Sequence, residues 1–124
     1  TTGWQLSLSL KAAAKMDNPE IFIVTIDRPE LDIFFKDDFA NRLERTYGRG
    51  NVVVDMSSVR FIDSTCLGKL AAMRRERARR DLPQEKLVIS SPQMRRIFEI
   101  VRFDTVWPIY DTLEEALETE LQLL

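Results

Sequence analysis

Apolar and polar residues repeat with two periods along the chain, and each period predicts one kind of element. In residues 4–10 (WQLSLSL) they alternate one by one, which is typical of a half-buried strand. Residues 21–26 (IFIVTI) are a continuous, largely β-branched run, which indicates a strand covered on both faces. Asp17-Asn18-Pro19 is a turn signal between them. We therefore expect these two strands to form a hairpin at one side of a sheet.

A helical period follows these strands. Phe35, Phe39, Leu43 and Tyr47 recur every four residues, and Gly48 with Gly50 ends the segment. Residues 64–80 also have helical composition, with an apolar arc of Cys66, Leu67, Leu70, Ala71 and Met73. Arg74 and Arg77 interrupt this arc. We expect their aliphatic stems to lie along the edge of the core with the charged heads in water.

Two more helices are predicted towards the C-terminus. Ser91-Pro92 combines an N-cap hydroxyl with proline at the first helical position, and an apolar stripe runs from Met94 to Val101. Asp111-Thr112, with Glu114 and Glu115 after it, predicts a capping box for the last helix. Short strands are expected at 52–55, 87–89 and 106–109, and a further apolar patch lies at 59–62.

The resulting order is β-β-α-β-α-β-α-β-α. Strands that alternate with helices predict an α/β fold with a mixed, mostly parallel sheet of four to five strands and about four helices. The 124 residues contain no repeat and no linker, and this length suits one domain with its own core. We expect a single domain over residues 1–124.

Composition narrows the function classes. Hydrophobic residues make up 44% and charged residues 31%, as in soluble globular proteins. No apolar run approaches the roughly 18 residues that span a bilayer, and no signal-peptide pattern opens the chain. We expect a cytoplasmic protein without membrane insertion. The first residue is Thr1 rather than Met, from which we expect the sequence to be trimmed.

Charge and rare residues exclude several chemistries. The net charge is −2, and although residues 69–80 are mostly basic, a nucleic-acid reading motif is absent, so no nucleic-acid partner is expected. Histidine is absent and Cys66 is the single cysteine. A disulfide within the chain is therefore impossible, and neither a zinc site nor a Ser-His or Cys-His nucleophile is expected. We predict no catalytic residue, no metal and no cofactor.

Residues 55–68 (DMSSVRFIDSTCLG) carry the most functional information. Asp63, Ser64 and Thr65 are all good N-cap residues, and spacing alone favours a plain helix start. The alternative is that Ser64 displays its hydroxyl at a helix N-terminus. A phosphate there would meet unpaired backbone N–H groups and would add about −1.5 to −2 charge beside Asp63.

The chain resembles the STAS domain family, the fold of bacterial anti-sigma-factor antagonists, from Ile21 to Leu117. Its signature is an apolar pair, Asp, Ser, Ser or Thr, a small residue, an apolar residue and Gly. Here the signature residues are Phe61, Ile62, Asp63, Ser64, Thr65, Cys66, Leu67 and Gly68. Glu30-Leu31-Asp32 resembles the second short motif of the family.

The resemblance implies a mechanism. The unmodified protein would bind an anti-sigma factor that is also a serine kinase and so regulate transcription, and phosphorylation of Ser64 would release the complex. A phosphatase would reset the switch, and Thr65 is a secondary acceptor. The implied partner-binding residues are Asp32, Asp63, Ser64, Thr65, Cys66, Leu67 and Gly68. The oligomeric state stays open and includes a weak homodimer.

Two residues depart from the family pattern. Cys66 stands where Gly is most frequent, and Arg28-Pro29 replaces the usual Gly before Glu30. Cysteine is small enough to keep the turn at negative φ, and we expect a buried, unreactive side chain because no His can activate it.

Two alternatives stay open. One is a constitutive STAS adaptor subunit of a transporter or sensory assembly, which needs no phosphorylation. The other is a small enzyme that uses Asp32, Asp55 and Asp63, three carboxylates whose strand ends would meet at one edge. Acidic residues at strand ends are common without catalysis, which disfavours the enzyme.

Overall fold

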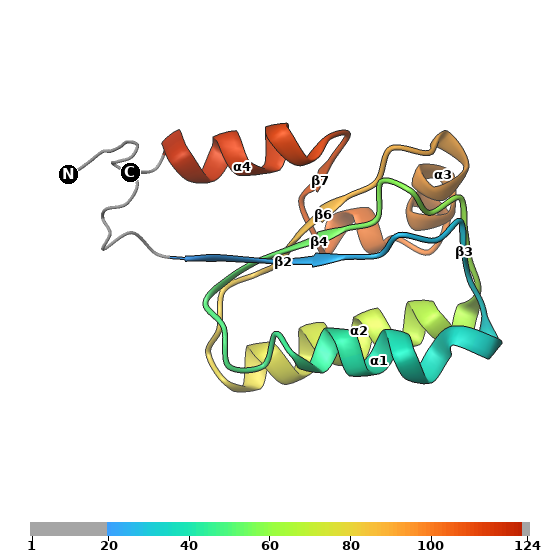
Figure 1. The fold of residues 1–124 in the computed structure, drawn as a ribbon, viewed down its shortest axis with the longest axis horizontal. Coiled ribbons are helices and arrows are strands. Elements are labelled where there is room, and N and C mark those ends of the chain that lie inside the picture. Colours follow the sequence, from blue (N-terminus) through green and yellow to red (C-terminus); the bar gives the residue numbers. More distant parts are fainter. Residues whose placement is uncertain (1–19, 123–124) are drawn as a thin grey trace.

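A computed structural model describes residues 20–122 of the chain (Figure 1). The predicted strand at residues 4–10, and with it the predicted hairpin, lies outside the described residues.

Four strands form the central sheet. They are β2 (Ile21–Thr25), β4 (Asn51–Asp55), β6 (Lys86–Val88) and β7 (Ile109–Tyr110), in the order β2-β4-β6-β7. Each of their pairings is parallel. A smaller parallel pair joins β3 (Glu30–Leu31) to β5 (Phe61–Ile62). The predicted α/β fold with a mostly parallel sheet and four helices is confirmed.

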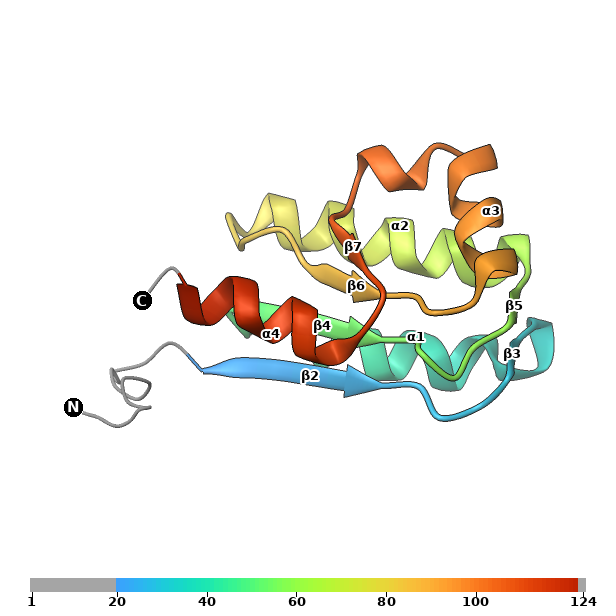
Figure 2. The same cartoon turned by 90° about the horizontal axis from the view of Figure 1, so that it is seen from above.

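Helices cover both faces of the central sheet. Helices α1 (Lys36–Glu44) and α2 (Ser64–Arg79) lie side by side on one face, and α4 (Leu113–Gln122) lies on the other (Figures 1 and 2). Successive side chains of a strand point to opposite faces. Accordingly, Val52 and Val54 pack into the large core with α1 and α2, whereas Val53 packs with Ala116 of α4. Within residues 20–122, no helix combines the length and the apolar character needed to cross a membrane.

Helix α3 (Pro92–Ile100) begins where the sequence predicted. Ser91 is its N-cap, and the Ser91 hydroxyl accepts a hydrogen bond from the Met94 N–H at 3.4 Å. Helix α4 begins with a variant of the predicted capping box. The Thr112 hydroxyl accepts from the Glu115 N–H, but the Glu115 carboxylate accepts from Asp111 N–H, one residue before the expected donor.

Some predicted boundaries shift. The last strand is not 106–109 but Ile109–Tyr110, preceded by the 3-10 helix η3 (Phe103–Thr105). Pro108 has no N–H, and its carbonyl accepts from Leu87 N–H at 3.0 Å, so pairing starts there. The strand expected at 87–89 spans Lys86–Val88. The 3-10 helix η2 (Ile33–Phe35) precedes α1, which ends at Glu44, so Tyr47 lies in the following turn.

The expectation for Arg77 is wrong. Its side chain is fully buried, and the guanidinium bonds Glu85 at 2.5 Å and the carbonyls of Thr46, Gly50 and others. Arg74 also bonds Glu85, at 2.8 Å, and Trp107 Nε1–H donates to the same carboxylate at 2.8 Å. A charge can be buried when it is paired and its donors are satisfied. Arg77 occupies a position on the core-facing arc of α2, and its charged head is buried there instead of reaching water.

Candidate functional site

The two-stranded sheet brings the two sequence motifs together. Glu30 pairs with Phe61 and Leu31 with Ile62, and the Asp63 N–H donates to the Leu31 carbonyl at 3.0 Å. Leu31 and Ile62 are buried and anchor the pair in the core. The β3–β5 pair lies at one end of the molecule (Figure 2). Because the two strands are parallel, Asp32 and Asp63 follow the same ends of the pair, and Asp63 directly precedes α2.

Asp63 caps α2, so the predicted helix start is confirmed. Its backbone is extended, and its Oδ1 accepts from Cys66 N–H at 2.9 Å. Ser64 is the first residue of α2 and is exposed. Within residues 20–122 the Ser64 side chain makes no hydrogen bond, because Asp63 performs the capping. The hydroxyl of Ser64 is therefore accessible to another protein.

Cys66 lies beneath this surface. It is fully buried, and its Sγ–H donates to the Asp32 carbonyl at 3.5 Å. The pKa of the thiol is raised to about 11, mainly by burial and also by the charges of Asp63 and Asp32, while the charge of Lys69 acts in the opposite direction. The thiolate is the reactive form of cysteine. Cys66 therefore joins the two motifs as a small buried residue, and α2 accommodates it at the position where the family prefers Gly.

The remaining predicted partner-binding residues divide between surface and core. Gly68 is exposed and Thr65 is partly exposed, whereas Leu67 is 8% exposed and belongs to the large core. Asp32 is partly exposed and caps η2, since its Oδ1 accepts from Phe34 N–H at 3.1 Å. Asp32, Asp63, Ser64, Thr65 and Gly68 thus reach the surface.

The third carboxylate of the enzyme alternative belongs to another element. Asp55 ends β4 in the central sheet, is 8% exposed, and accepts from Ser57 N–H at 3.0 Å. This turn contact explains an acidic residue at that position without catalysis. Among the described residues, no three His, Cys, Asp or Glu side chains are grouped so that they could hold a metal ion.

Three exposed apolar side chains lie in η2 and β5, close to the two motifs in the sequence, and the sequence reasoning missed them. Phe34 is 94% exposed, Ile33 is 53% exposed and Phe61 is 47% exposed. The available signal was the run Ile33-Phe34-Phe35 directly after Asp32. Residues 33–35 form the 3-10 helix η2, in which consecutive residues point in directions about 120° apart, so they cannot all face the core.

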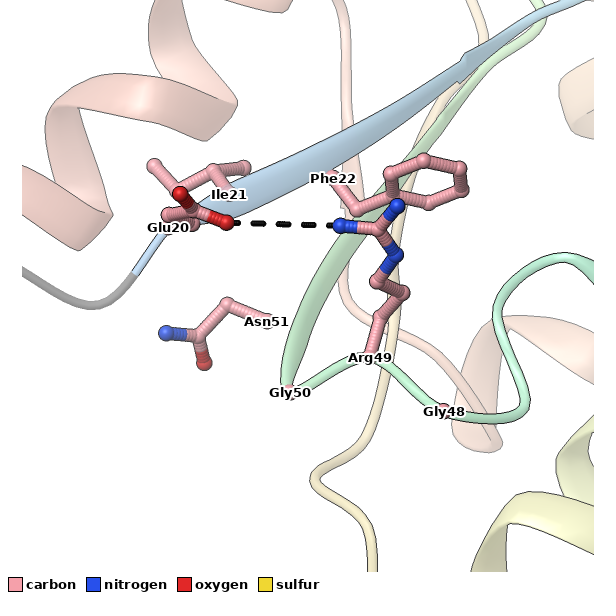
Figure 3. Close-up of a pocket in the computed structure, with 7 residues that line it drawn as sticks. All are labelled: Glu20, Ile21, Phe22, Gly48, Arg49, Gly50 and Asn51. Carbon is pink, nitrogen blue, oxygen red and sulfur yellow. Dashed lines mark ion pairs between the residues drawn. The ribbon is translucent and has the colours of Figure 1, made fainter.

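A surface hollow lies where β2 and β4 begin (Figure 3). It measures about 590 Å³ and contains none of the predicted site residues. Arg49 spans it, with an ion pair to Glu20 at 4.0 Å and its guanidinium 4.3 Å from the Phe22 ring centre. A second hollow, of about 430 Å³, adjoins the start of α3 at Ser91 and includes Arg60. Neither hollow includes Ser64.

Comparisons with known proteins agree with this geometry. The STAS domain description matches residues 12–116 of the chain. No curated protein sequence matches. Among solved structures, an anti-sigma factor antagonist from Mycobacterium paratuberculosis is 24% identical, with a TM-score of 0.67 over 80% of this chain and 84% of that one.

Two other solved structures represent different uses of the fold. The Bacillus cell fate determinant SpoIIAA in its phosphorylated form is 20% identical, with a TM-score of 0.61 over 84% of this chain and 94% of that one. A sulfate transporter family protein from Wolinella succinogenes is 18% identical, with a TM-score of 0.64 over 83% and 86% of the two chains. At these identities the likeness establishes the fold.

Proposed function

The chain belongs to the STAS domain family, and we propose that it is an anti-sigma-factor antagonist whose binding is switched at Ser64. STAS domains form a regulatory and binding family. In this proposal the unphosphorylated chain is a cytoplasmic, non-enzymatic protein that binds an anti-sigma factor with serine-kinase activity and so regulates transcription. Phosphorylation of Ser64 releases the complex, and a phosphatase restores binding.

The observation that supports this proposal best is the division of roles between Asp63 and Ser64. Asp63 caps α2, which leaves the Ser64 hydroxyl exposed and without a hydrogen bond in the described part of the chain. A kinase can reach this hydroxyl without breaking a structural contact. Thr65, which is partly exposed, is the secondary acceptor.

The charges around Ser64 explain how a phosphate would act. Asp63 is adjacent and Asp32 follows the neighbouring strand. A phosphoryl group adds about −1.5 to −2 charge and three oxygen atoms. In a protein interface this dianion would lose its water beside a carboxylate of the same sign, and its bulk would separate surfaces that pack around a serine. We expect the complex to dissociate for these reasons.

The experiment compares binding by chains that differ at one serine. The wild type, Ser64→Asp and Ser64→Ala are used to capture partners from cells of the source organism, and phosphate on Ser64 is sought by mass spectrometry. We expect the wild type and Ser64→Ala to capture a kinase-like anti-sigma factor, which ATP and Mg²⁺ release from the wild type only. Ser58→Asp is the matched control, because Ser58 is also exposed. Equal capture by Ser64→Asp and wild type would refute the switch.

A constitutive adaptor subunit is the second candidate. The exposed side chains of Ile33, Phe34 and Phe61 favour it, since an apolar contact needs no phosphate. The same experiment separates the two functions. An adaptor would bind its transporter or sensory partner equally well before and after Ser64→Asp, and Ser64 would carry no phosphate in cells.

A further inference from the structure

Gly68 occupies a position in α2 where the fold does not require a glycine. It is exposed, and its backbone is one that any residue adopts, since no glycine among residues 20–122 has a positive φ. Beyond its own helix, a Cβ at this position would meet no atom of the described residues within 4 Å. Glycine destabilises the interior of a helix relative to alanine. The stability of the fold alone would therefore favour a side chain at position 68.

The missing side chain matters because Gly68 follows Ser64 by one helical turn. Residues four apart lie on the same face of a helix, and Ser64 and Gly68 are both exposed. Side chains lean towards the N-terminus of their helix, so each covers the turn before its own Cα. Within α2, the positions whose side chains would cover Ser64 are therefore 67 and 68.

Neither of these positions covers Ser64. Leu67 is only 8% exposed and packs into the large core, and Gly68 has no side chain. The neighbouring carboxylate of Asp63 is held against the helix, because its Oδ1 accepts from Cys66 N–H at 2.9 Å. The Ser64 hydroxyl is therefore open on the side of the next helical turn.

Phosphoryl transfer needs this open space. The Ser64 Oγ would attack the γ-phosphorus of ATP: the new Oγ–P bond forms as the bond to the ADP oxygen breaks, and the hydroxyl proton passes to a base of the kinase. The reacting atoms must first come within about 3–3.5 Å of each other. Serine is short, and α2 is fixed to the core through Leu67 and Leu70. The catalytic site of the kinase must therefore approach the backbone of α2 closely.

We propose that Gly68 determines the access of the kinase to Ser64, because a side chain at position 68 would occupy the space that the catalytic site needs. This inference rests on the proposed function, and it adds a residue that controls the reaction without touching the reacting atoms. The property that matters is the size of the residue at position 68. Gly68 is thus a positioning residue for the phosphorylation of Ser64.

A size series at position 68 tests the proposal. Wild type, Gly68→Ala and Gly68→Gln are incubated with ATP, Mg²⁺ and lysate of the source organism, with phosphatases inhibited, and the initial rate of phosphorylation at Ser64 is followed by mass spectrometry. We expect Gly68→Gln to lower the rate about tenfold or more and Gly68→Ala to lower it less. Both variants should raise Tm, by about 4 °C, because a glycine is removed from a helix interior. A lower rate in a more stable protein separates access from misfolding.

Gly48→Gln is the matched control. Gly48 is also exposed, and a Cβ there would also meet no atom within 4 Å, but Gly48 lines the hollow at the start of β2 and β4. Equal rates for Gly68→Gln and Gly48→Gln would overturn the proposal. An equal loss in Gly68→Ala and Gly68→Gln would also overturn it, since alanine removes the flexibility of glycine and adds little bulk. Wild type without phosphate on Ser64 would refute the proposed function, and this inference with it.

Thiol labelling tests the steric argument without a kinase. Ser64→Cys is reacted with a maleimide, alone and combined with Gly68→Gln. The wild type measures the background from Cys66, which is buried and whose pKa is raised to about 11. We expect Gly68→Gln to slow the labelling of the introduced thiol severalfold. A labelling rate that Gly68→Gln leaves unchanged would show that position 68 does not cover position 64, and the proposal would be wrong.

Discussion

At the residue scale, Arg77 and Glu85 are the least replaceable polar pair in the described structure. Both side chains have no exposed surface, and Glu85 accepts from Arg77, Arg74 and Trp107. Arg77 also donates to carbonyls in the turn after α1 and in the turn before β6. The pair thus fixes two connections around the sheet, and removing one member would leave the other charged and buried.

We predict that Glu85→Ala lowers the free energy of unfolding by about 3–5 kcal/mol, the usual loss for a broken buried ion pair. Urea unfolding measures it. Glu76→Ala is the matched control, because Glu76 also binds two arginines, Arg79 and Arg80, but on the surface of α2. We expect the control to cost only a small fraction of that loss, since solvent screens exposed pairs. Equal losses would show that the Glu85 network contributes no more than a surface pair.

At the element scale, two adjacent residues at the start of α2 differ in their roles: Asp63 caps the helix, and Ser64 is the proposed site of the switch. We predict that Asp63→Ala lowers the free energy of unfolding by about 1 kcal/mol, because the N-cap bond to Cys66 N–H is lost. Asp63→Asn keeps an acceptor and should lose less. Ser64→Ala should change stability by less than about 0.5 kcal/mol, as expected of an exposed residue without contacts. Thermal and urea unfolding of the three variants test this order.

The contrary result would be informative about the site. If Ser64→Ala destabilised the protein as much as Asp63→Ala, the Ser64 hydroxyl would take part in capping. Its exposure would then no longer mark it as a kinase substrate.

The elements that the sequence predicted well are those set by local pattern. The run Val52–Val54 and the cap Ser91-Pro92 need only their neighbours, and both were recognised. The strand Glu30–Leu31 was not predicted as a strand, because two residues become one only by pairing with Phe61–Ile62, about thirty residues later. Burial of Arg77 likewise depends on carbonyls about thirty residues away. For the candidate site, the family motif pointed to Ser64 in the sequence. The exposure of Phe34 could be recognised only in the structure, because it depends on the turn at Asp32.

At the scale of the whole molecule, the candidate surface and the large core use different residues of α2. Ser64 stands outside the large core, whereas Leu67 and Leu70 of the same helix pack into it. An anion at position 64 gains from the helix N-terminus and loses from the adjacent Asp63 carboxylate. These effects oppose each other, and neither disturbs the packing between α2 and the sheet. A phosphate should therefore change what the surface binds and leave the fold as it is.

We predict that Ser64→Asp and the phosphorylated chain unfold within about 1 kcal/mol of the wild type, the usual limit for a charge at a helix end. Amide hydrogen exchange in β4 and β6 should stay unchanged. Leu70→Ala is the positive control, because Leu70 is fully buried in α2 and its truncation should cost about 2–5 kcal/mol. If Ser64→Asp instead lost protection in β4 or β6, as Leu70→Ala should, the switch would act by loosening the domain. Release of the partner would then no longer be a surface effect at Ser64.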